Sequence, residues 1–435
     1  MTGCLAFDEL PRSIAQSVVC PTSRNPSRPA VTTLLGDARL FIELGPGKFI
    51  DRLIVFGRRR TILPASPAAA AVDMIAKMEH TQANSIQLIG VSLPWITGNL
   101  PGMGGTCKER AEDFSVEEIP AYPPEETGEF LFLLVEKTGI SAEQLTSHLA
   151  RCLKIAHQDV GTAGMKDRQA VTRQMVSVPL RCQSLVESFQ HEQIRILEVH
   201  RHRHKLRTGH LKGNRFSILI RNVGPDALET ALPIGAEIAR TGVPNFFGDQ
   251  RFGRDAETLK LGLDLLQGTK SPAAIPRARR KFLLRLALSA VQSALFNRAL
   301  IERMRDGLVH QVLAGDVMQV VASGGPFVVE DAVCDQARFE AREIVISGPL
   351  FGPKMKQPAG EVAAREARLL DDSGIPLEVF DRFSNLTPGT RRPYLVWPED
   401  LKISSEPDGI RLEFTLPSGC YATVVLREFQ KSASA

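Results

Sequence analysis

The order of strand-like and helix-like segments is the feature that most restricts the fold of this chain. An apolar run, FLFLLVEKT (130–138), is followed by one helix-like segment and then by three runs typical of strands, QMVSVP, RILEVHRHR and FSILIRNV. A repeating strand–helix–strand series would need a helix in each of the later connections, which are instead short or turn-rich. The pattern therefore predicts an α+β fold that is rich in antiparallel pairing.

Two segments predict helices with defined ends. Ser141 precedes the segment AEQLTSHLARCLKI, and Gln144 stands at the position that completes a capping box. The segment 280–307 predicts a long helix that ends at Gly307. Near the C-terminus, IRLEFTLPSGCYATVVLREF predicts two strands joined by a Pro/Ser/Gly turn.

The composition fits a water-soluble globular protein. Of the 435 residues, 43% are hydrophobic and 23% are charged, and no apolar run is long enough to span a bilayer. The first residues, MTGCLAFDELPRS, lack the basic region and apolar core of a signal peptide, so we expect a cytoplasmic protein with no membrane partner. The length favours two domains, and we expect a monomer, although the sequence leaves the oligomeric state open.

The distribution of cysteine and histidine argues against a metal site. The seven cysteines are scattered, and none forms a CxxC pair that would indicate zinc or a disulfide framework. The densest histidine cluster, HRHRH (200–204), contains arginines that would repel a cation, and no acid or cysteine completes a ligand set. We therefore expect no metal.

Two further regions stand out by composition. Residues 1–90 contain RNPSRPAV, GRRRT and PASPAAAAV without a sustained period, and we predict an atypical, poorly ordered N-terminal extension. Between Glu198 and Asp226 the chain has seven lysines and arginines and no acid. Such a stretch attracts polyanions, because each phosphate contact releases a counterion. A solvated basic surface is the alternative, and the charge run alone leaves both interpretations open.

Seven motifs, taken together, carry a family resemblance. They run in order from about residue 93 to 430: AEDFSVEEIP, GMKDRQAVTRQ, KLRTGHLKGNRFSI, PNFFGDQRFG, SAVQSALFNRALIERM, RRPYLVWPEDL and LPSGCYATVVLRE. With these motifs the chain resembles the TruD family of tRNA pseudouridine synthases. The resemblance implies a catalytic domain with a mixed, mainly antiparallel sheet (91–256 and 389–435) and an inserted second α+β domain (257–388). The cleft between the two domains would bind RNA.

The family reaction isomerises uridine to pseudouridine. It breaks the bond between N1 and C1′, turns the base and rejoins it through C5, and it uses neither a metal nor a cofactor. The resemblance implies tRNA as the partner and uridine 13 of tRNA as the target. The alternatives are a non-catalytic RNA-binding or RNA-folding protein on the same scaffold, and a nucleoside hydrolase that would release free uracil.

In the motif GMKDRQAVTRQ the resemblance implies that Asp167 is the catalytic carboxylate. A carboxylate is anionic at neutral pH, and it can either attack carbon or take a proton. For an isolated aspartate, a surface ion pair at a turn is the alternative. Lys166 and Arg168 flank Asp167. On an extended chain their side chains point away from that of Asp167, so we expect them to contact phosphate groups.

The motif PNFFGDQRFG supplies residues for the target base. The resemblance implies that Phe247 packs on the uracil and that Asn245 helps to fix its polar edge. Gln250 and Arg251 contact the substrate or brace the loop, and both roles stay open. Lys108 pairs with Asp167 or with a phosphate, and a solvent-facing lysine is the alternative.

The remaining motif residues are expected to contact the RNA backbone or to pack in the core. The resemblance favours RNA contact for five residues of the basic window: Arg203, Lys205, Arg207, Lys212 and Arg215. We expect Phe246 and Phe252 to be core residues, and Asn297 and Arg303 to pack within the long helix. Cys420 stands where the family usually has serine, which weakens any role for a hydrogen bond there.

Overall fold

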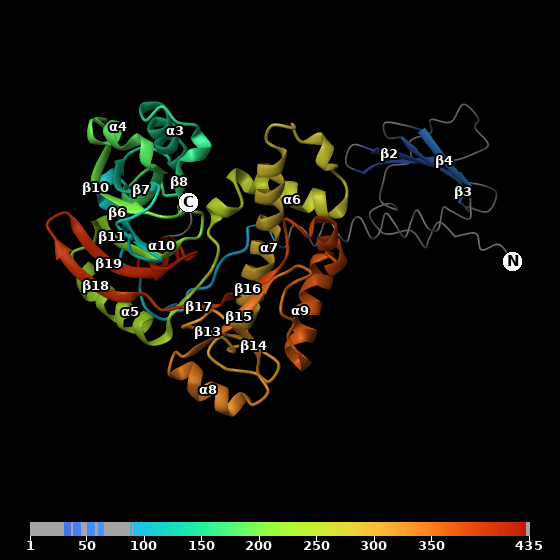
Figure 1. Cartoon of the computed structure of the whole chain (residues 1–435). Helices are drawn as coiled ribbons and strands as arrows, with labels where there is room; N and C mark the ends of the chain where they lie inside the picture. Colours follow the sequence, from blue (N-terminus) through green and yellow to red (C-terminus); the bar gives the residue numbers. More distant parts are fainter. Residues whose placement is uncertain are drawn as a thin grey trace. The chain divides into compact units, whose positions relative to one another are not determined.

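The structure is a computed structural model that describes the backbone of residues 30–35, 38–44, 50–56, 60–64, 88 and 90–431. It divides into two units, Met1–Val91 with Asp371–Ile375, and Ser92–Leu370 with Pro376–Ala435. In the first unit, four strands pair antiparallel in chain order (Figure 1): β1 (Ala30–Leu35), β2 (Ala38–Leu44), β3 (Ile50–Phe56) and β4 (Arg60–Pro64). The sequence prediction for residues 1–90 did not include these strands, and its remaining part lies outside the described residues.

The largest sheet in the second unit has nine strands. Its main path is β10 (Ile194–His202), β7 (Phe130–Thr138), β9 (Val171–Pro179), β6 (Phe114–Pro120), β11 (Leu211–Val223), β19 (Gly409–Pro417) and β18 (Glu399–Glu406). Two short strands extend it, since β5 (Gly104–Thr106) pairs with β11 and β8 (Gly161–Thr162) pairs with β9. Only β6 and β9 run parallel. The expected mixed, mainly antiparallel sheet is therefore confirmed.

Helices cover this sheet because their apolar positions repeat at helical spacing. Helix α3 (Ala142–Cys152) begins with both hydrogen bonds of the predicted capping box, which join Ser141 and Gln144. Its leucines join β7 and β9 in one buried core. Helix α5 (Ala227–Thr241) packs beside β18, and α10 (Ala422–Gln430) contacts α5. A short helix, α4 (Gln183–Glu187), completes this layer.

A second, smaller sheet lies in the inserted part of the chain. Its order is β14 (Pro326–Val328), β13 (Val317–Val320), β15 (Ile344–Leu350) and β16 (Thr390–Pro393), all antiparallel. Four helices accompany it (Figure 1): α6 (Glu257–Gln267), α7 (Arg280–Arg305), α8 (Ala332–Glu340) and α9 (Gly360–Ser373). The predicted long helix is thus confirmed as α7. Among the described residues, no helix has both the length and the apolar character that a membrane span requires.

One domain boundary and one predicted strand differ from the sequence prediction. Residues 390–393 were expected in the catalytic domain, but β16 pairs with β15 of the second sheet. The chain then passes through β17 (Leu395–Val396), which pairs with β12 (Val243–Pro244), and re-enters the large sheet at β18. The second predicted C-terminal strand is wrong, because that segment forms α10. Its paired valines favour a strand locally, but Val425 and Phe429 are buried one helical turn apart.

Candidate active site

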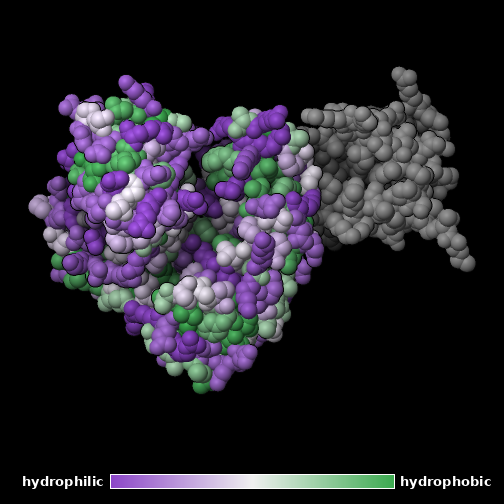
Figure 2. Space-filling view, viewed as in Figure 1, coloured by the Kyte–Doolittle hydropathy of each residue, from purple (hydrophilic) through white to green (hydrophobic). Residues whose placement is uncertain are grey.

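Three segments of the second unit enclose a cleft of about 370 Å³. They are the turn before β9 (163–167), the segment at the start of β11 (208–211) and the turn between β19 and α10 (418–423). Phe114, Val116, Asn214, Phe216 and Gln250 complete the lining. In Figure 2 the visible face of this unit is hollowed between the part built on the large sheet and the part that contains α6 and α7, with hydrophilic residues around the hollow.

The turn that carries Asp167 is fixed by close packing at both ends. On the side of β8, a side chain on Gly161 would collide with Ser177 and with the carbonyl of Leu206, so the position requires glycine. On the other side, Ala170 is fully buried at the start of β9. The side chain of Asp167 nevertheless keeps 44% of its surface exposed. The fold therefore presents this carboxylate to the cleft on a rigid support.

The side chain of Lys108 forms an ion pair with that of Asp167. Its Nζ lies 2.7 Å from Asp167 Oδ2, and it also lies 4.2 Å from the centre of the Phe114 ring. Lys108 itself has a φ of 65°, an unusual backbone conformation for a non-glycine residue. Of the roles that the sequence left open for Lys108, this structure contains the ion pair with Asp167.

Lys166 has a different partner from the expected one. Its Nζ lies 2.7 Å from Glu118 Oε2, and the two side chains are 6% and 0% exposed. The expectation that Lys166 contacts phosphate rested on its direction along an extended chain. Glu118 is 48 residues away in sequence, and the parallel pairing of β6 with β9 brings it there. Arg168, by contrast, is exposed, as a phosphate contact requires.

Lys137 is a buried cation that the sequence analysis missed. It is fully buried on β7, and its Nζ donates hydrogen bonds to the carbonyl oxygens of Asp167 at 2.6 Å and of Ile140 at 2.8 Å. Burial lowers the pKa of Lys137 to about 8. A lysine inside the apolar run FLFLLVEKT was the available signal, because an unpaired lysine is rarely fully buried. Lys137 ties the backbone of Asp167 to the sheet.

Phe247 lies behind the opposite wall of the cleft. Its ring is 6.1 Å from the ring of Tyr421, which lines the cleft and is 37% exposed, whereas Phe247 itself is 6% exposed. Asn297 on α7 accepts a hydrogen bond from the Phe247 N–H at 2.9 Å and donates one to its carbonyl at 2.8 Å. The expected packing role of Asn297 is confirmed, and it fixes the backbone of Phe247.

Asn245 and Arg392 form a buried polar network next to Phe247. Asn245 is 1% exposed and does not line the cleft, and its Oδ1 accepts a hydrogen bond from Arg392 Nη2 at 2.5 Å. Arg392 Nη1 donates to the Gly419 carbonyl at 2.9 Å, and its guanidinium lies 4.2 Å from the centre of the Phe247 ring. Burial lowers the pKa of Arg392. Arg392, on β16, therefore joins the inserted part to the turn 418–423, a link that the sequence analysis missed.

The rest of PNFFGDQRFG divides between cleft and core. Gln250 lines the cleft, while Arg251 donates to Ser293 Oγ at 3.2 Å and so braces the loop against α7. Phe246 is fully buried, as expected for a core residue, and Phe252 is partly buried. Within this motif, Gln250 is thus the side chain with direct access to the cleft.

Part of the basic window is compensated by acids from elsewhere in the chain. Arg203 pairs with Glu125 at 3.3 Å and Arg215 with Glu117 at 3.6 Å, while Lys205 donates to a backbone carbonyl. These pairs are exposed, and such contacts exchange readily for phosphate. Arg207 and Lys212 have no ion pair or side-chain hydrogen bond within the described part of the chain. The structure therefore leaves fewer unpaired cations in the window than the local sequence indicates.

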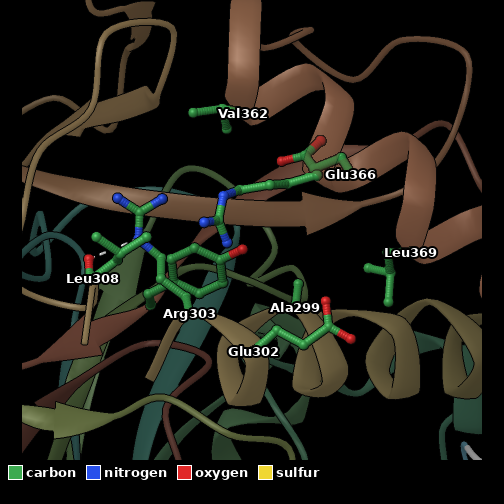
Figure 3. A pocket seen from close by; sticks show the side chains of 9 residues that line it. Ala299, Glu302, Arg303, Leu308, Val362, Glu366 and Leu369 are labelled. Atoms are coloured by element: carbon green, nitrogen blue, oxygen red, sulfur yellow. Dashed lines mark hydrogen bonds between the residues drawn. The ribbon is translucent and has the colours of Figure 1, made fainter. Parts of the chain in front are cut away.

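A second, much smaller cavity of about 40 Å³ lies in the inserted part (Figure 3). Arg303 from α7 and Glu366 from α9 reach into it. Arg303 bonds both carboxylate oxygens of Asp316 at 2.7 Å, and Glu366 pairs with Arg391 at 2.6 Å. The cavity is too small for a nucleotide, and both of these charged side chains already have partners outside its lining. The expected structural role of Arg303 is confirmed.

The histidines of the cluster 200–204 form hydrogen bonds and ring contacts with other residues of the protein. His200 lies between Glu126 and Glu198, and the hydrogen bond to Glu198 is the main cause of its raised pKa. His202 is buried and stacks on Phe132 with ring centres 4.3 Å apart. In the described residues, no three or more His, Cys, Asp and Glu side chains gather in a way that could hold a metal ion.

Comparison with known proteins places this geometry in a family. A sequence model described as tRNA pseudouridine synthase D (TruD) matches residues 91–277 and 276–429. A tRNA pseudouridine synthase D from Anaeromyxobacter dehalogenans (strain 2CP-C) is 45% identical over 342 residues, which cover 78% of this chain and 97% of that protein. An enzyme of the same name from Thermus thermophilus is 39% identical over 341 residues, covering 78% and 92%.

A solved structure supports the same relationship at the level of the fold. It comes from Methanosarcina mazei and is assigned as a tRNA pseudouridine synthase D (TruD). It superposes on this chain with a TM-score of 0.64 and 25% sequence identity, and it covers 80% of this chain and 98% of its own. The similarity therefore extends over both sheets of the second unit.

Proposed function

The chain belongs to the TruD family of tRNA pseudouridine synthases, isomerases that act on tRNA, and we propose that Asp167 is its catalytic carboxylate and uridine 13 of tRNA its target. The position of Asp167 is the observation that supports its catalytic role. Its carboxylate is half-exposed in the larger cleft, while its backbone is tied to the sheet. A reacting group must be both accessible and held in place.

Two routes lead from this carboxylate to pseudouridine. In one, an Asp167 oxygen attacks C1′ or C6 of the target nucleotide. In the other, it removes a proton from the sugar to give a glycal, and the base then rejoins through C5. Both routes need a carboxylate that reaches the nucleotide, and Asp167 lines the cleft with the Lys108 ammonium 2.7 Å from its Oδ2. The proposal holds for either route.

The opposite wall supports a role in holding the target base. An enzyme that acts on a base inside folded RNA turns the nucleotide out of its stack. We assign the surface around Tyr421, with the Phe247 ring directly behind it, as the platform on which the uracil packs. Gln250 lines the same cleft and can bond the polar edge of the base. Asn245 holds Arg392 and so supports this platform indirectly.

Replacement of Asp167 by asparagine tests the proposal. The variant keeps the size of the side chain but removes its charge, so we expect pseudouridine formation to fall by roughly 10³-fold or more. The assay uses purified protein and a tRNA transcript, with each uridine mapped for pseudouridine. Asp226→Asn is the control, since Asp226 is exposed and does not line the cleft.

The outcomes separate the proposal from its alternatives. Unchanged modification by Asp167→Asn would remove the catalytic role of Asp167. A protein that binds tRNA but leaves every uridine unmodified would be a non-catalytic RNA-binding protein. Release of free uracil would instead indicate a hydrolase. Modification at a uridine other than position 13 would correct the target and leave the role of Asp167 intact.

A further inference from the structure

The inserted part of the chain carries a second stretch without acids. Between Asp264 and Glu302 there is no aspartate or glutamate, but the stretch contains seven cations: Lys270, Arg277, Arg279, Arg280, Lys281, Arg285 and Arg298. Most of them gather at the beginning of α7 and in the turn before it. Of these seven cations, only Arg298 lies within a family motif, SAVQSALFNRALIERM.

Only two of the seven cations have partners within the described residues. Arg280 donates hydrogen bonds to the carbonyls of Ala273 and Ile275, and Arg298 pairs with Glu302 at 2.6 Å. The other five are exposed and have no ion pair or side-chain hydrogen bond in that part of the structure. In the basic window on the large sheet, by contrast, Glu125 and Glu117 pair with Arg203 and Arg215.

We define the α7 basic surface as Arg277, Arg279, Lys281, Phe282 and Arg285. All five side chains are exposed, and Phe282 has 58% of its surface in solvent. An exposed aromatic ring among cations is the combination that binds nucleic acid, because cations contact phosphates and rings stack on unpaired bases. A long exposed aromatic side chain has no evident role in folding at this position.

The position of these cations conflicts with local helix electrostatics. The N-terminal end of a helix carries partial positive charge, so acids stabilise it and cations destabilise it. The first turn of α7 contains no acid and begins with Arg280 and Lys281. Residues that break a local rule without a compensating contact are often retained for function.

We propose that the α7 basic surface binds the phosphate backbone of the tRNA substrate at a second point, away from the catalytic cleft. This inference rests on tRNA being the substrate. The chemistry of the surface fits a polyanion that also presents unpaired bases, which a folded tRNA provides. Because the contacts are to phosphates, they contribute affinity and leave the choice of the modified uridine to the cleft.

Helix α7 sets the separation between the two binding points. Asn297 on α7 bonds the backbone of Phe247 at the cleft wall, and Arg285 and Lys281 lie 12 and 16 residues earlier on the same helix. At 1.5 Å per residue, this places them about 18 and about 24 Å along the helix. Along a duplex strand, which advances about 3.4 Å per phosphate, this length takes roughly five to seven steps. A full tRNA reaches both points, whereas a trinucleotide is too short to reach the second.

The test removes three cations of the surface and measures tRNA kinetics. In the variant R277A/K281A/R285A we expect KM for full-length tRNA to rise about tenfold at physiological salt, with kcat unchanged. The dependence of log(kcat/KM) on log[salt] should become shallower by roughly two units, since about 0.7–0.9 is lost with each phosphate contact. The variant K354A/K356A/R368A is the control, because it loses three exposed cations from the same inserted part of the chain.

Two further measurements separate binding from folding. The melting temperature of R277A/K281A/R285A should stay the same or rise, because its cations oppose the helix dipole. With a trinucleotide that contains the target uridine, wild type and variant should have equal kcat/KM. An unchanged KM and salt dependence for tRNA would overturn the inference, as would an equal effect in the control variant. Neither result would affect the role of Asp167, which its own variant tests.

Discussion

The two walls of the cleft differ in where their support comes from. The wall with Asp167 is held within one sheet: Lys137 on β7 bonds its backbone and Lys108 pairs with its carboxylate. The wall with Tyr421 and Phe247 is held from the inserted part, by Arg392 on β16 and by Asn297 on α7. The first wall is thus supported by residues on or next to the large sheet, whereas the second also depends on residues of the inserted part. The inserted part is therefore a structural component of the site, beyond any contact it makes with RNA.

Among the variants that test this difference between the walls, Arg392→Met should have the largest effect. The change removes the hydrogen bonds that Arg392 donates to Asn245 and to the Gly419 carbonyl. Losing these buried, charge-assisted bonds should lower kcat/KM for tRNA roughly hundredfold, about 3 kcal/mol. Arg391→Met is the matched control: it is the preceding residue on β16, but its guanidinium pairs with Glu366 at the small cavity. The Arg391→Met variant should have a lower melting temperature, and the kcat/KM of its folded form for tRNA should be unchanged.

If both arginine variants lost activity equally, the inserted part would act only through its general stability. If neither did, the second wall would be supported within the large sheet, like the first. Either result would remove the difference between the two walls. A selective loss in Arg392→Met would instead establish that one strand of the inserted part supports both a stabilising ion pair and the cleft wall.

The next effect concerns the pH dependence of stability that Lys137 gives to the first wall. The pKa of Lys137 is about 8 in the folded protein, mainly because of burial, against an ordinary value of 10.5. Asp167 raises this pKa and Lys166 lowers it, so both contribute to the final value. Between these two pH values the unfolded chain holds a proton that the native protein lacks. The free energy of unfolding should therefore rise with pH by about 1.4 kcal/mol per unit, relative to Lys137→Met.

Urea unfolding of both proteins from pH 7 to pH 10 measures this difference. The other titrating groups are common to both chains and cancel in the comparison. Below pH 8 the difference should be constant, because Lys137 is protonated in both states. Parallel curves over the whole range would mean that Lys137 keeps its ordinary pKa in the folded protein.

The sequence predicted those parts of the fold that local patterns determine. The capping box at Ser141, the buried strand β7 and the helix α7 each follow from neighbouring residues alone, and the structure contains all three. The seven motifs also indicated the family, which the comparisons show. Within the site, the resemblance left two partners open for Lys108, Asp167 or a phosphate, and the structure contains the pair with Asp167.

The sequence could not show which charges meet across the sheet. Lys166 pairs with Glu118 because β6 and β9 run parallel, a pairing that no local pattern specifies. Arg203 and Arg215 likewise meet acids from other parts of the chain, so an acid-free window in sequence is not an unpaired surface in space. The helix α10 was mistaken for a strand because its valines are β-branched, whereas its burial period comes from tertiary packing.

A smaller effect is expected from Lys137→Met on catalysis. The side chain holds the carbonyls of Asp167 and Ile140, and without it the turn that carries the carboxylate loses its tie to β7. We expect kcat to fall about tenfold, because a slightly misplaced carboxylate weakens the transition state more than it weakens substrate binding. KM for tRNA should not change, because a fully buried lysine does not contact RNA. A rise in KM with constant kcat would contradict a positioning role.

The smallest effect is expected from Lys108→Met. The ion pair with Asp167 is half-exposed at the aspartate, and pairs of this kind contribute about 0.2–1 kcal/mol. We expect kcat at saturating tRNA to fall roughly two- to fivefold, with little change in melting temperature. The loss should be greater in 50 mM salt than in 500 mM salt, since salt screens exposed charges. Lys402→Met is the control, because Lys402 is exposed on β18 and does not line the cleft. A loss as large as that of Asp167→Asn would mean that Lys108 itself takes part in the chemistry, and the first wall would then carry two reacting groups instead of one.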